Sequence, residues 1–390
     1  MSAADTPQGT PGTPDWAARA DHAARSVTRH FGRSLLFLPG THLAASVRPS
    51  SHSPFQSWNY WWQAHYVDCL VDAGLRELAS GSRFDGGDRR SAGELASRVV
   101  ASIRLRNFLR YVNSYYDDMA WLALAVLRLD SLAARAQKPG RRRNARLQKS
   151  LSPQFESAST QHMGGGTFWS TKRDFKNAPA TAPVALHFAR TGKHERAQGL
   201  LDWLDVTLFE PTLGLYLDGA WVKEGKLVLA EEIYTYNQGP VLGALLELGG
   251  DANLAHAAAL VGSVAEHLTV REPDTQGKLV LRGEGTGDGG LFTGILVRYL
   301  SLAAGDLRLP APTRATAREL VLDTAEALWA GRTVRTDDAN EASGKDDGGW
   351  LVFSTEPQRP AAETYAPGTA VELSTQLQAW MVLEAAARVH

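Results

Sequence analysis

Two adjacent aspartates, Asp117 and Asp118, are the residues of this 390-residue chain whose types and spacing point most clearly to chemistry. They stand between aromatic residues, Tyr115 and Tyr116 before them and Trp121 after them. Neighbouring carboxylates disfavour double ionisation, so the pKa of one rises while that of the other stays low. A protonated carboxyl beside an anionic one is what hydrolysis of a glycosidic bond requires.

The same pair also has a purely structural interpretation. Aspartate is favoured at the N-cap and in the first turn of a helix, where it meets free N–H groups and the positive end of the helix dipole. Against this, two like charges stand where one cap would suffice. The segment that follows, Met119 to Leu129, is apolar on nearly every side and is therefore expected to be a buried helix. We expect the pair to face a cavity rather than bulk water.

Helical periodicity dominates the segments that must position this pair. Strand patterns are sparse: residues 213–217 and 226–230 suggest a small hairpin, and residues 278–282 a further short strand. Because strands and helices do not alternate, the chain predicts an all-α fold, a toroid of paired helices. The expected helices cover residues 16–30, 58–78, 93–112, 116–134, 178–191, 194–208, 238–249, 252–269, 288–304, 313–331 and 370–388.

Long connections separate some of these helices, and such connections in a compact domain are usually functional or disordered. Arg141-Arg142-Arg143 falls in one of them and is expected to lie in a solvated loop. Residues 1–14 are rich in Pro, Gly and Thr and are expected to be disordered, whereas residues 15–390 are expected to form a single domain. The long connections are residues 34–57, 138–175, 209–236, 271–287 and 332–369.

Composition and missing motifs exclude several classes of function. The chain has 41 Lys and Arg and 42 Asp and Glu, a net charge of −1, which argues against a nucleic-acid partner. It has no secretory signal and no run of about 18 apolar residues, so we expect no membrane partner and a cytoplasmic location. The motifs H-E-x-x-H, C-x-x-C and G-x-S-x-G do not occur, and we expect neither a metal nor a cofactor. The oligomeric state cannot be read from the sequence.

Further residues could bind a polar ligand, and each has a structural alternative. Gly165 lies in a run of three glycines that would let the backbone pass close to a ligand, and Trp169 could stack on a sugar or lie in the core. Tyr236 could stack on a ligand or pack in the core. Asn237 and Gln238 could hydrogen-bond to hydroxyl groups, or Asn237 could cap a helix.

Asp288 and Trp61 could likewise have either a structural role or a role in ligand binding. Asp288 could cap the helix that follows it or bind a hydroxyl group. Trp61 could pack against neighbouring helices or present its ring to a ligand.

Five stretches of the chain, in the same order, resemble motifs of glycoside hydrolase family 76, the α-1,6-mannanases. Each motif alone is a weak signal, but their common order makes the resemblance specific. Residues 115–121 resemble the family's Asp-Asp signature. The similarity covers most of residues 58–304, and the other similar stretches are residues 58–64, 164–169 with 175–178, 234–239 and 287–292, with a similar tail at 375–380.

The resemblance implies an (α/α)6 barrel whose long loops form a sugar groove, and a retaining hydrolase acting on α-1,6-linked mannan or manno-oligosaccharides without a cofactor. It also implies that Asp117 is the nucleophile and Asp118 the general acid and base. The residues expected to bind the oligosaccharide are Trp61, Tyr116, Gly165, Trp169, Asn177, Tyr236, Asn237, Gln238 and Asp288.

Two other functions stay open at this point. A sugar isomerase or epimerase, which helical toroids also host, would use a pair of histidines as acid and base, and no histidine falls inside the residues singled out above. A non-catalytic glycan-binding protein would keep the groove and would tolerate the loss of either aspartate.

Overall fold

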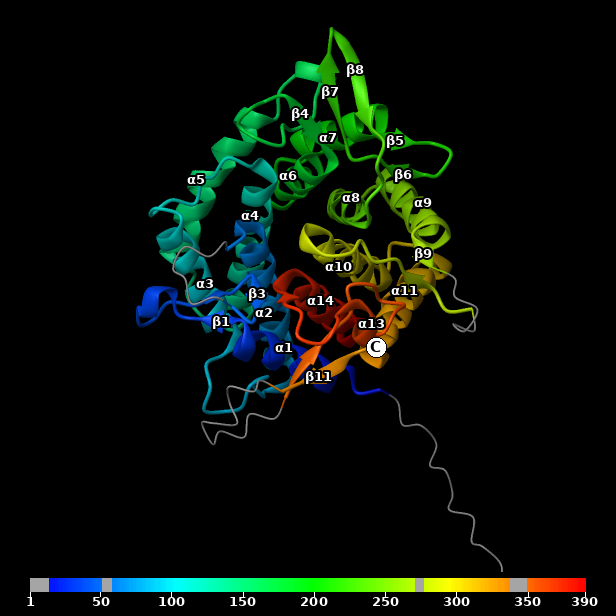
Figure 1. The fold of residues 1–390 in the computed structure, drawn as a ribbon. Coiled ribbons are helices and arrows are strands. Elements are labelled where there is room, and N and C mark those ends of the chain that lie inside the picture. Colours follow the sequence, from blue (N-terminus) through cyan, green and yellow to red (C-terminus); the bar gives the residue numbers. More distant parts are fainter. Residues whose placement is uncertain (1–13, 51–57, 271–276, 337–348) are drawn as a thin grey trace, which may run out of the picture.

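The computed structural model describes residues 14–50, 58–270, 277–336 and 349–390. The disorder expected for residues 1–14 therefore falls, except for Pro14, outside the described residues. Six helices form an inner ring in which each helix contacts the next and the last contacts the first (Figure 1). They are α2 (Tyr60–Ser80), α4 (Tyr116–Arg135), α6 (Ala178–Arg190), α8 (Thr235–Leu248), α10 (Phe292–Gly305) and α14 (Leu373–Val389).

A second set of helices surrounds this ring and alternates with it along the chain, which confirms the predicted (α/α)6 barrel. The inner helices are buried on most sides, whereas the outer ones bury one face. No helix of the described residues is both long and apolar enough to cross a bilayer. The outer helices are α1 (Trp16–His30), α3 (Ala92–Arg106), α5 (Arg142–Ala158), α7 (His194–Thr207), α9 (Asp251–His267) and α11 (Ala311–Ala330), and a short α13 (Ala361–Thr364) precedes α14.

Helix α5 lies where a loop was predicted, so the expectation for residues 138–175 is wrong in this part. The run Arg141-Arg142-Arg143 caps and begins this helix instead of lying in a loop. The arginines at its start and Pro153 in its interior made the helical pattern hard to recognise in the sequence. That pattern is plain in the residues that α5 buries at spacings of three or four: Leu147, Leu151, Phe155 and Ala158.

Short strands join the ends of the helices. The predicted hairpin of residues 213–217 with 226–230 is wrong in its pairing, because the strand within residues 213–217 pairs with residues 209–210 instead. β8 (Lys226–Ala230) pairs with β7 (Gly219–Lys223) across a two-residue turn in which Glu224 and Gly225 both have positive φ, the geometry that suits a tight hairpin. This hairpin projects from the top of the molecule in Figure 1.

The remaining strands are two or three residues long. Val280 and Leu281 confirm the short strand predicted at residues 278–282. β4 (Phe175–Asn177) extends the β7–β8 hairpin. The other pairs are β1 (Gly32–Arg33) with β2 (Leu43–Ala44), β3 (Val47–Arg48) with β13 (Val371–Glu372), β5 (Phe209–Glu210) with β6 (Leu215–Tyr216), β9 (Thr269–Val270) with β10 (Val280–Leu281), and β11 (Thr333–Arg335) with β12 (Trp350–Val352).

A glutamine at the fourth position of three inner helices ties each helix to the segment before it. The side chains of Gln63, Gln238 and Gln376 are buried. Each accepts the backbone N–H and donates to the backbone carbonyl of one residue, at 2.9 to 3.1 Å. Because a buried peptide group needs both hydrogen bonds, these amides fix the loops at the N-terminal end of the ring. The residues held in this way are Ala44, Tyr216 and Phe353, respectively.

Deeper in the ring, ion pairs join four inner helices. Asp72 of α2 contacts Arg128 of α4, Arg298 of α10 at 3.1 Å, and Arg388 of α14 at 2.8 Å. Burial would raise the pKa of Asp72, but the three guanidinium groups outweigh burial and hold this pKa below its usual range. These contacts fix the inner helices relative to one another below their N-terminal ends.

We predict that Gln376→Leu lowers the free energy of unfolding by about 2 to 4 kcal/mol, because the buried N–H and carbonyl of Phe353 lose their partner. Denaturant titration followed by circular dichroism measures this change. Gln161→Leu, at an exposed position, is the matched control. An equal loss of stability in the two variants would contradict the role given to the buried amide.

Candidate active site

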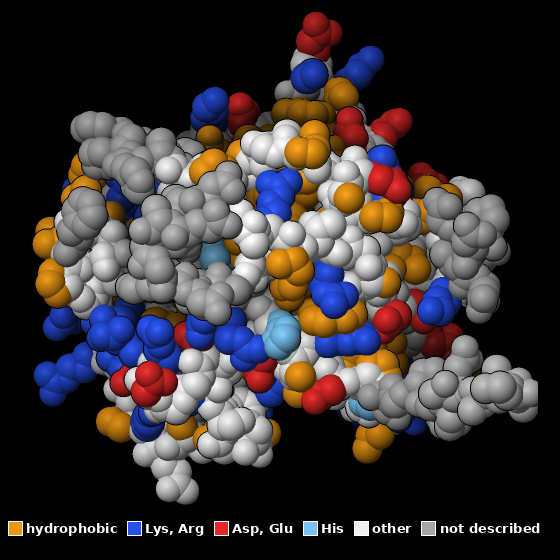
Figure 2. Space-filling view, turned by 60° about the horizontal axis from the view of Figure 1, so that its bottom comes forward, with side chains coloured by type: hydrophobic (Ala, Val, Ile, Leu, Met, Phe, Trp, Pro, Cys, Tyr) orange, Lys and Arg blue, Asp and Glu red, His pale blue; other side chains and the backbone are white. Residues whose placement is uncertain are grey.

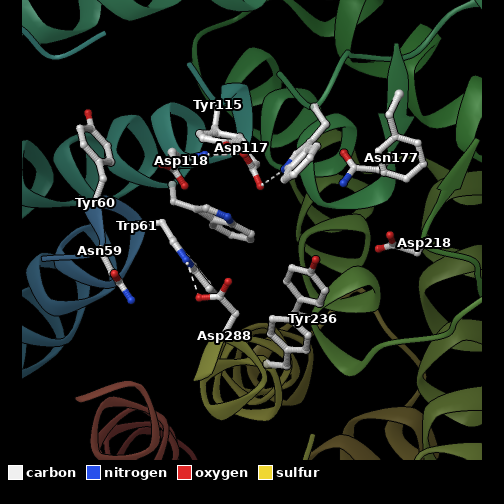
Figure 3. Close-up of a pocket in the computed structure, with 14 residues that line it drawn as sticks. Asn59, Tyr60, Trp61, Tyr115, Asp117, Asp118, Asn177, Asp218, Tyr236 and Asp288 are labelled. Carbon is white, nitrogen blue, oxygen red and sulfur yellow. Dashed lines mark hydrogen bonds between the residues drawn. The ribbon is translucent and has the colours of Figure 1, made fainter. Parts of the chain in front are cut away.

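One pocket, with a volume of about 460 Å³, opens at the N-terminal ends of the inner helices (Figure 3). Four carboxyl groups share it with aromatic rings and amide side chains. The lining residues are Asn59, Tyr60, Trp61, Tyr115, Asp117, Asp118, Trp121, Trp169, Phe175, Asn177, Asp218, Tyr236, Asp288 and Phe292.

Asp117 is the second residue of α4, and hydrogen bonds reach both of its carboxyl oxygens. The backbone N–H of Asp118 donates to Oδ1 at 2.9 Å, and the indole Nε1 of Trp169 donates to Oδ2 at 3.0 Å. Burial raises the pKa of Asp117, while these two donors act in the opposite direction because they favour the anion. The positive end of the α4 dipole favours the anion as well.

Asp118 has a different environment. Its Oδ2 accepts one hydrogen bond, from Nδ2 of Asn113 at 2.6 Å. Burial, followed by the charge of Asp117, raises the pKa of Asp118 well above its usual range. The unequal surroundings therefore favour a proton on Asp118 and a negative charge on Asp117.

Asp288 lies in the 3₁₀ turn η4 (Gly287–Leu291) on the wall opposite the pair. Its Oδ1 accepts hydrogen bonds from the indole Nε1 of Trp61 at 3.0 Å and of Trp62 at 2.9 Å. The side chain makes no capping hydrogen bond to α10, which begins at Phe292. Two indoles thus orient a carboxylate toward the pocket.

Asp218, which the sequence analysis missed, supplies the fourth carboxyl group. Burial raises its pKa to about 6, and Nδ2 of Asn237 lies 3.5 Å from its Oδ1. The Asp218-Gly219 pair looks like an ordinary turn in the sequence, so the only local signal was an aspartate directly after an apolar strand. Its neighbour Tyr236 stacks on Phe292 with a centroid separation of 3.7 Å and points its hydroxyl into the pocket (Figure 3).

The loop that carries Trp169 is organised around the buried ammonium group of Lys176. Burial lowers the pKa of this side chain to about 8. Gly165 lies in this loop but does not line the pocket. It packs against Trp203 instead, and a Cβ on Gly165 would fall 2.9 Å from the indole ring. The close backbone approach expected at Gly165 is therefore to a tryptophan. Nζ of Lys176 donates to the carbonyls of Thr160, His162, Gly165 and Gly166 at 2.5 to 3.0 Å.

The structure brings most of the sequence-predicted residues together around this pocket. Besides Gly165, three predicted residues do not line it: Tyr116 is buried while Tyr115 faces the pocket, Asn237 is buried beside Asp218, and Gln238 holds the backbone of Tyr216. The predicted residues that do line it are Asp117, Asp118, Trp61, Trp169, Asn177, Tyr236 and Asp288.

Other lining residues escaped the sequence analysis because nothing in their local pattern sets them apart from core residues. Asn59 directly precedes α2 and Tyr60 is its first residue, Phe175 lies in β4, Trp121 lies in the second turn of α4, and Phe292 begins α10. In the described part of the chain, no group of three or more His, Cys, Asp or Glu side chains is placed to hold a metal ion.

Comparison with solved structures places this architecture among known enzymes. The chain is similar to the GH76A α-1,6-mannanase from Salegentibacter sp. HEL1_6, with 28% identity, a TM-score of 0.77, and coverage of 96% of this chain and 100% of the mannanase. An inactive variant of that enzyme, with two consecutive aspartates replaced by asparagine, was solved in complex with α-1,6-mannotriose and matches with a TM-score of 0.76, 28% identity and the same coverage.

A third structure, the Lin0763 protein from Listeria innocua, shares the fold at 24% identity and a TM-score of 0.72, covering 96% of this chain and 97% of that protein. A comparison with curated proteins returned no match. The model of glycosyl hydrolase family 76 matches residues 39–364, most of the chain. This extent of similarity shows that the chain belongs to glycosyl hydrolase family 76.

Proposed function

We propose that this glycoside hydrolase is a retaining enzyme that cleaves α-1,6-linked mannan or manno-oligosaccharides, with Asp117 as nucleophile and Asp118 as general acid and base. One observation carries the proposal: adjacent carboxyl groups in one pocket receive unequal hydrogen bonds, which separates an anion from a proton donor. The similarity to an α-1,6-mannanase, and the mannotriose complex of its inactive variant, support the choice of substrate.

In the first step of the proposed mechanism, the Asp117 carboxylate attacks the anomeric carbon and Asp118 donates its proton to the glycosidic oxygen. The bond between the anomeric carbon and that oxygen breaks, and the sugar forms an ester with Asp117. In the second step, Asp118 takes a proton from water as the water oxygen attacks the anomeric carbon. The ester bond then breaks, and Asp117 leaves as a carboxylate.

The other pocket residues bind and orient the sugar in this proposal. Asp218 and Asp288 accept hydrogen bonds from sugar hydroxyls on the walls facing the aspartate pair. The rings of Trp61 and Trp121 offer flat apolar surfaces to a sugar ring. The reaction requires no cofactor, because both the nucleophile and the proton come from side chains.

The two alternatives from the sequence fit this site less well. No histidine lines the pocket among the described residues, so the histidine pair of an isomerase or epimerase is not found there. A non-catalytic binding protein would not need one carboxylate to be stabilised by two donors while its neighbour is kept protonated.

We expect Asp117→Asn and Asp118→Asn each to reduce hydrolysis of α-1,6-mannotriose by at least about 10³-fold, which corresponds to about 4 kcal/mol of transition-state stabilisation. The loss in Asp118→Asn should be smaller with an aryl mannoside, because a good leaving group needs no proton. Initial rates with both substrates measure the effect. Asp174→Asn, at an exposed position near the site, is the control. Near-normal turnover in either catalytic variant would remove the assignment.

The pH dependence should separate the two roles. Asn113 donates to Asp118, which lowers its pKa, so Asn113→Ala should move the alkaline limb of the kcat/KM profile to higher pH. Trp169 donates to Asp117, which lowers its pKa, so Trp169→Phe should move the acidic limb to higher pH. Each substitution should leave the other limb nearly in place. A shift of either limb to lower pH would contradict these assignments.

Replacing the proton donor should also change stability with pH. The folded-state pKa of Asp118 lies above its unfolded value, so the wild type loses stability as pH rises from about 4, the ordinary value for aspartate, through the folded pKa. Asparagine does not titrate, so the melting temperature of Asp118→Asn should rise relative to that of the wild type as the pH increases from 4 to 8. A difference that stays constant or narrows over this range would argue against a protonated Asp118.

A further inference from the structure

The net charge of −1 conceals a strong separation of charge along the chain. Residues 14–150 contain 21 Lys and Arg against 11 Asp and Glu, whereas residues 151–390 contain 20 against 30. The first segment forms α1 to α5, at the bottom and on the left of the ring in Figure 1. The side of the barrel that residues 14–150 build therefore carries a surplus of basic residues.

The positive charge is most concentrated where carboxylates are missing. Residues 95–116 and 131–155 together contain eleven Lys and Arg and no Asp or Glu. The first segment is most of α3 and the loop to α4, and the second runs from the end of α4 through most of α5. Figure 2 shows Lys and Arg side chains gathered on the left of the molecule, the side where Figure 1 places α3 and α5.

These two segments form one continuous surface, which we call the basic face. Nη1 of Arg143 in α5 donates to the carbonyl of Ser97 in α3 at 2.8 Å. Burial raises the pKa of Tyr111, and the charges of Arg143, Arg104 and Arg146 oppose this rise. In the described residues, no carboxylate pairs with Arg104 or Arg146.

The last turn of α3 and the loop after it, at the edge of the basic face, present apolar side chains to solvent. Phe108 is 85% exposed, Leu109 59% and Leu105 43%. Phe108 and Leu109 both have positive φ, and two side chains hold this turn in place. Nδ2 of Asn107 donates to the carbonyls of Arg110 and Val112, and Nε of Arg104 donates to the carbonyl of Leu109, at 3.0 to 3.2 Å. The phenyl ring thus projects from an ordered turn.

We propose that the basic face rests on the surface of an anionic lipid bilayer, with Phe108 and Leu109 entering the interfacial layer and the arginines contacting lipid phosphates. Exposed apolar side chains beside carboxylate-free basic segments combine the two attractions that hold a protein on such a surface. A soluble polyanion would use the arginines but would leave the apolar tip in water. The earlier expectation of no membrane partner rested on segments that cross a bilayer, whereas this contact needs none.

The same loop reaches the active-site pocket from its other end. The hydroxyl of Tyr60 donates to the carbonyl of Tyr111 at 2.7 Å, and Asn113 holds Asp118. A bilayer under the basic face would therefore lie one loop away from the catalytic pair. Lipid binding can be measured without substrate, so this inference stands or falls independently of the proposed hydrolysis.

The test is sedimentation of the full chain with vesicles of phosphatidylcholine, or of phosphatidylcholine with one third phosphatidylglycerol. We expect at least tenfold stronger partition into the anionic vesicles, weakening as salt is added. Each arginine near the surface is expected to strengthen partition about fivefold, so the double variant Arg110→Gln with Arg146→Gln should lower partition about 25-fold. Phe108→Ser with Leu109→Ser should lower it about tenfold or more.

Matched controls lie elsewhere on the molecule. Leu307→Ser replaces an equally exposed apolar residue, 82% exposed, after α10, and Lys223→Gln with Lys226→Gln removes two cations from the β7–β8 turn. Neither should change partition. Equal binding to both kinds of vesicle would overturn the proposal. Loss of binding with the arginine pair but not with the Phe108 and Leu109 pair would also overturn it, in favour of a soluble polyanion.

A probe on the loop tests insertion directly. The sole cysteine, Cys69, is buried, so Phe108→Cys offers a single exposed thiol for an environment-sensitive fluorophore. We expect its emission to shift to the blue with anionic vesicles and to stay unchanged with phosphatidylcholine alone. Emission that stays unchanged with anionic vesicles to which the protein is bound would contradict insertion of the apolar tip.

Discussion

Electrostatic repulsion between two carboxyl groups in one helical turn is the constraint on which the rest of this structure depends. Asp117 and Asp118 are both removed from bulk water, and it costs much free energy for both to be ionised there at once. The chain resolves this conflict by giving Asp117 two donors and Asp118 one. The resulting difference between the two groups is what lets a pair of identical residues play two chemical parts.

Holding that difference requires a rigid frame, and the barrel supplies it from several directions. Trp169 can donate to Asp117 because its loop is fixed by the carbonyls that surround Lys176. The buried glutamines of the inner helices fix other loops at the same end of the ring. Deeper in the ring, the ion pairs of Asp72 join helices that approach the site from different sides. The pocket is thus built from segments far apart in the chain.

The sequence predicted the elements whose signals are local. The helical period and the adjacent aspartates required no knowledge of the fold, so the toroid and the position of the pair could be predicted. Helix α5 was missed because charged residues and a proline interrupt its pattern, and the strand partner of residues 226–230 was misassigned because pairing depends on the turn between strands.

The rest of the site depends on contacts that a single sequence does not reveal. Asp218 looks like a turn residue until β4 and β7 bring it to the pocket, and Gln238 resembles a ligand-binding amide until its hydrogen bonds to Tyr216 are seen. Gly165 illustrates the same point, because its small size serves the ring of Trp203. Residue type suggested a role at each position, but only the fold showed which partner the residue meets.

The most direct test of the central claim is a carboxyl-carbon NMR titration of the aspartate-labelled protein, with Asp117→Asn and Asp118→Asn used to assign the two signals. The account predicts that Asp117 loses its proton first and that Asp118 remains protonated at a pH where Asp117 is ionised. Ionisation of Asp118 before Asp117, or of both groups near the ordinary aspartate value of about 4, would contradict it.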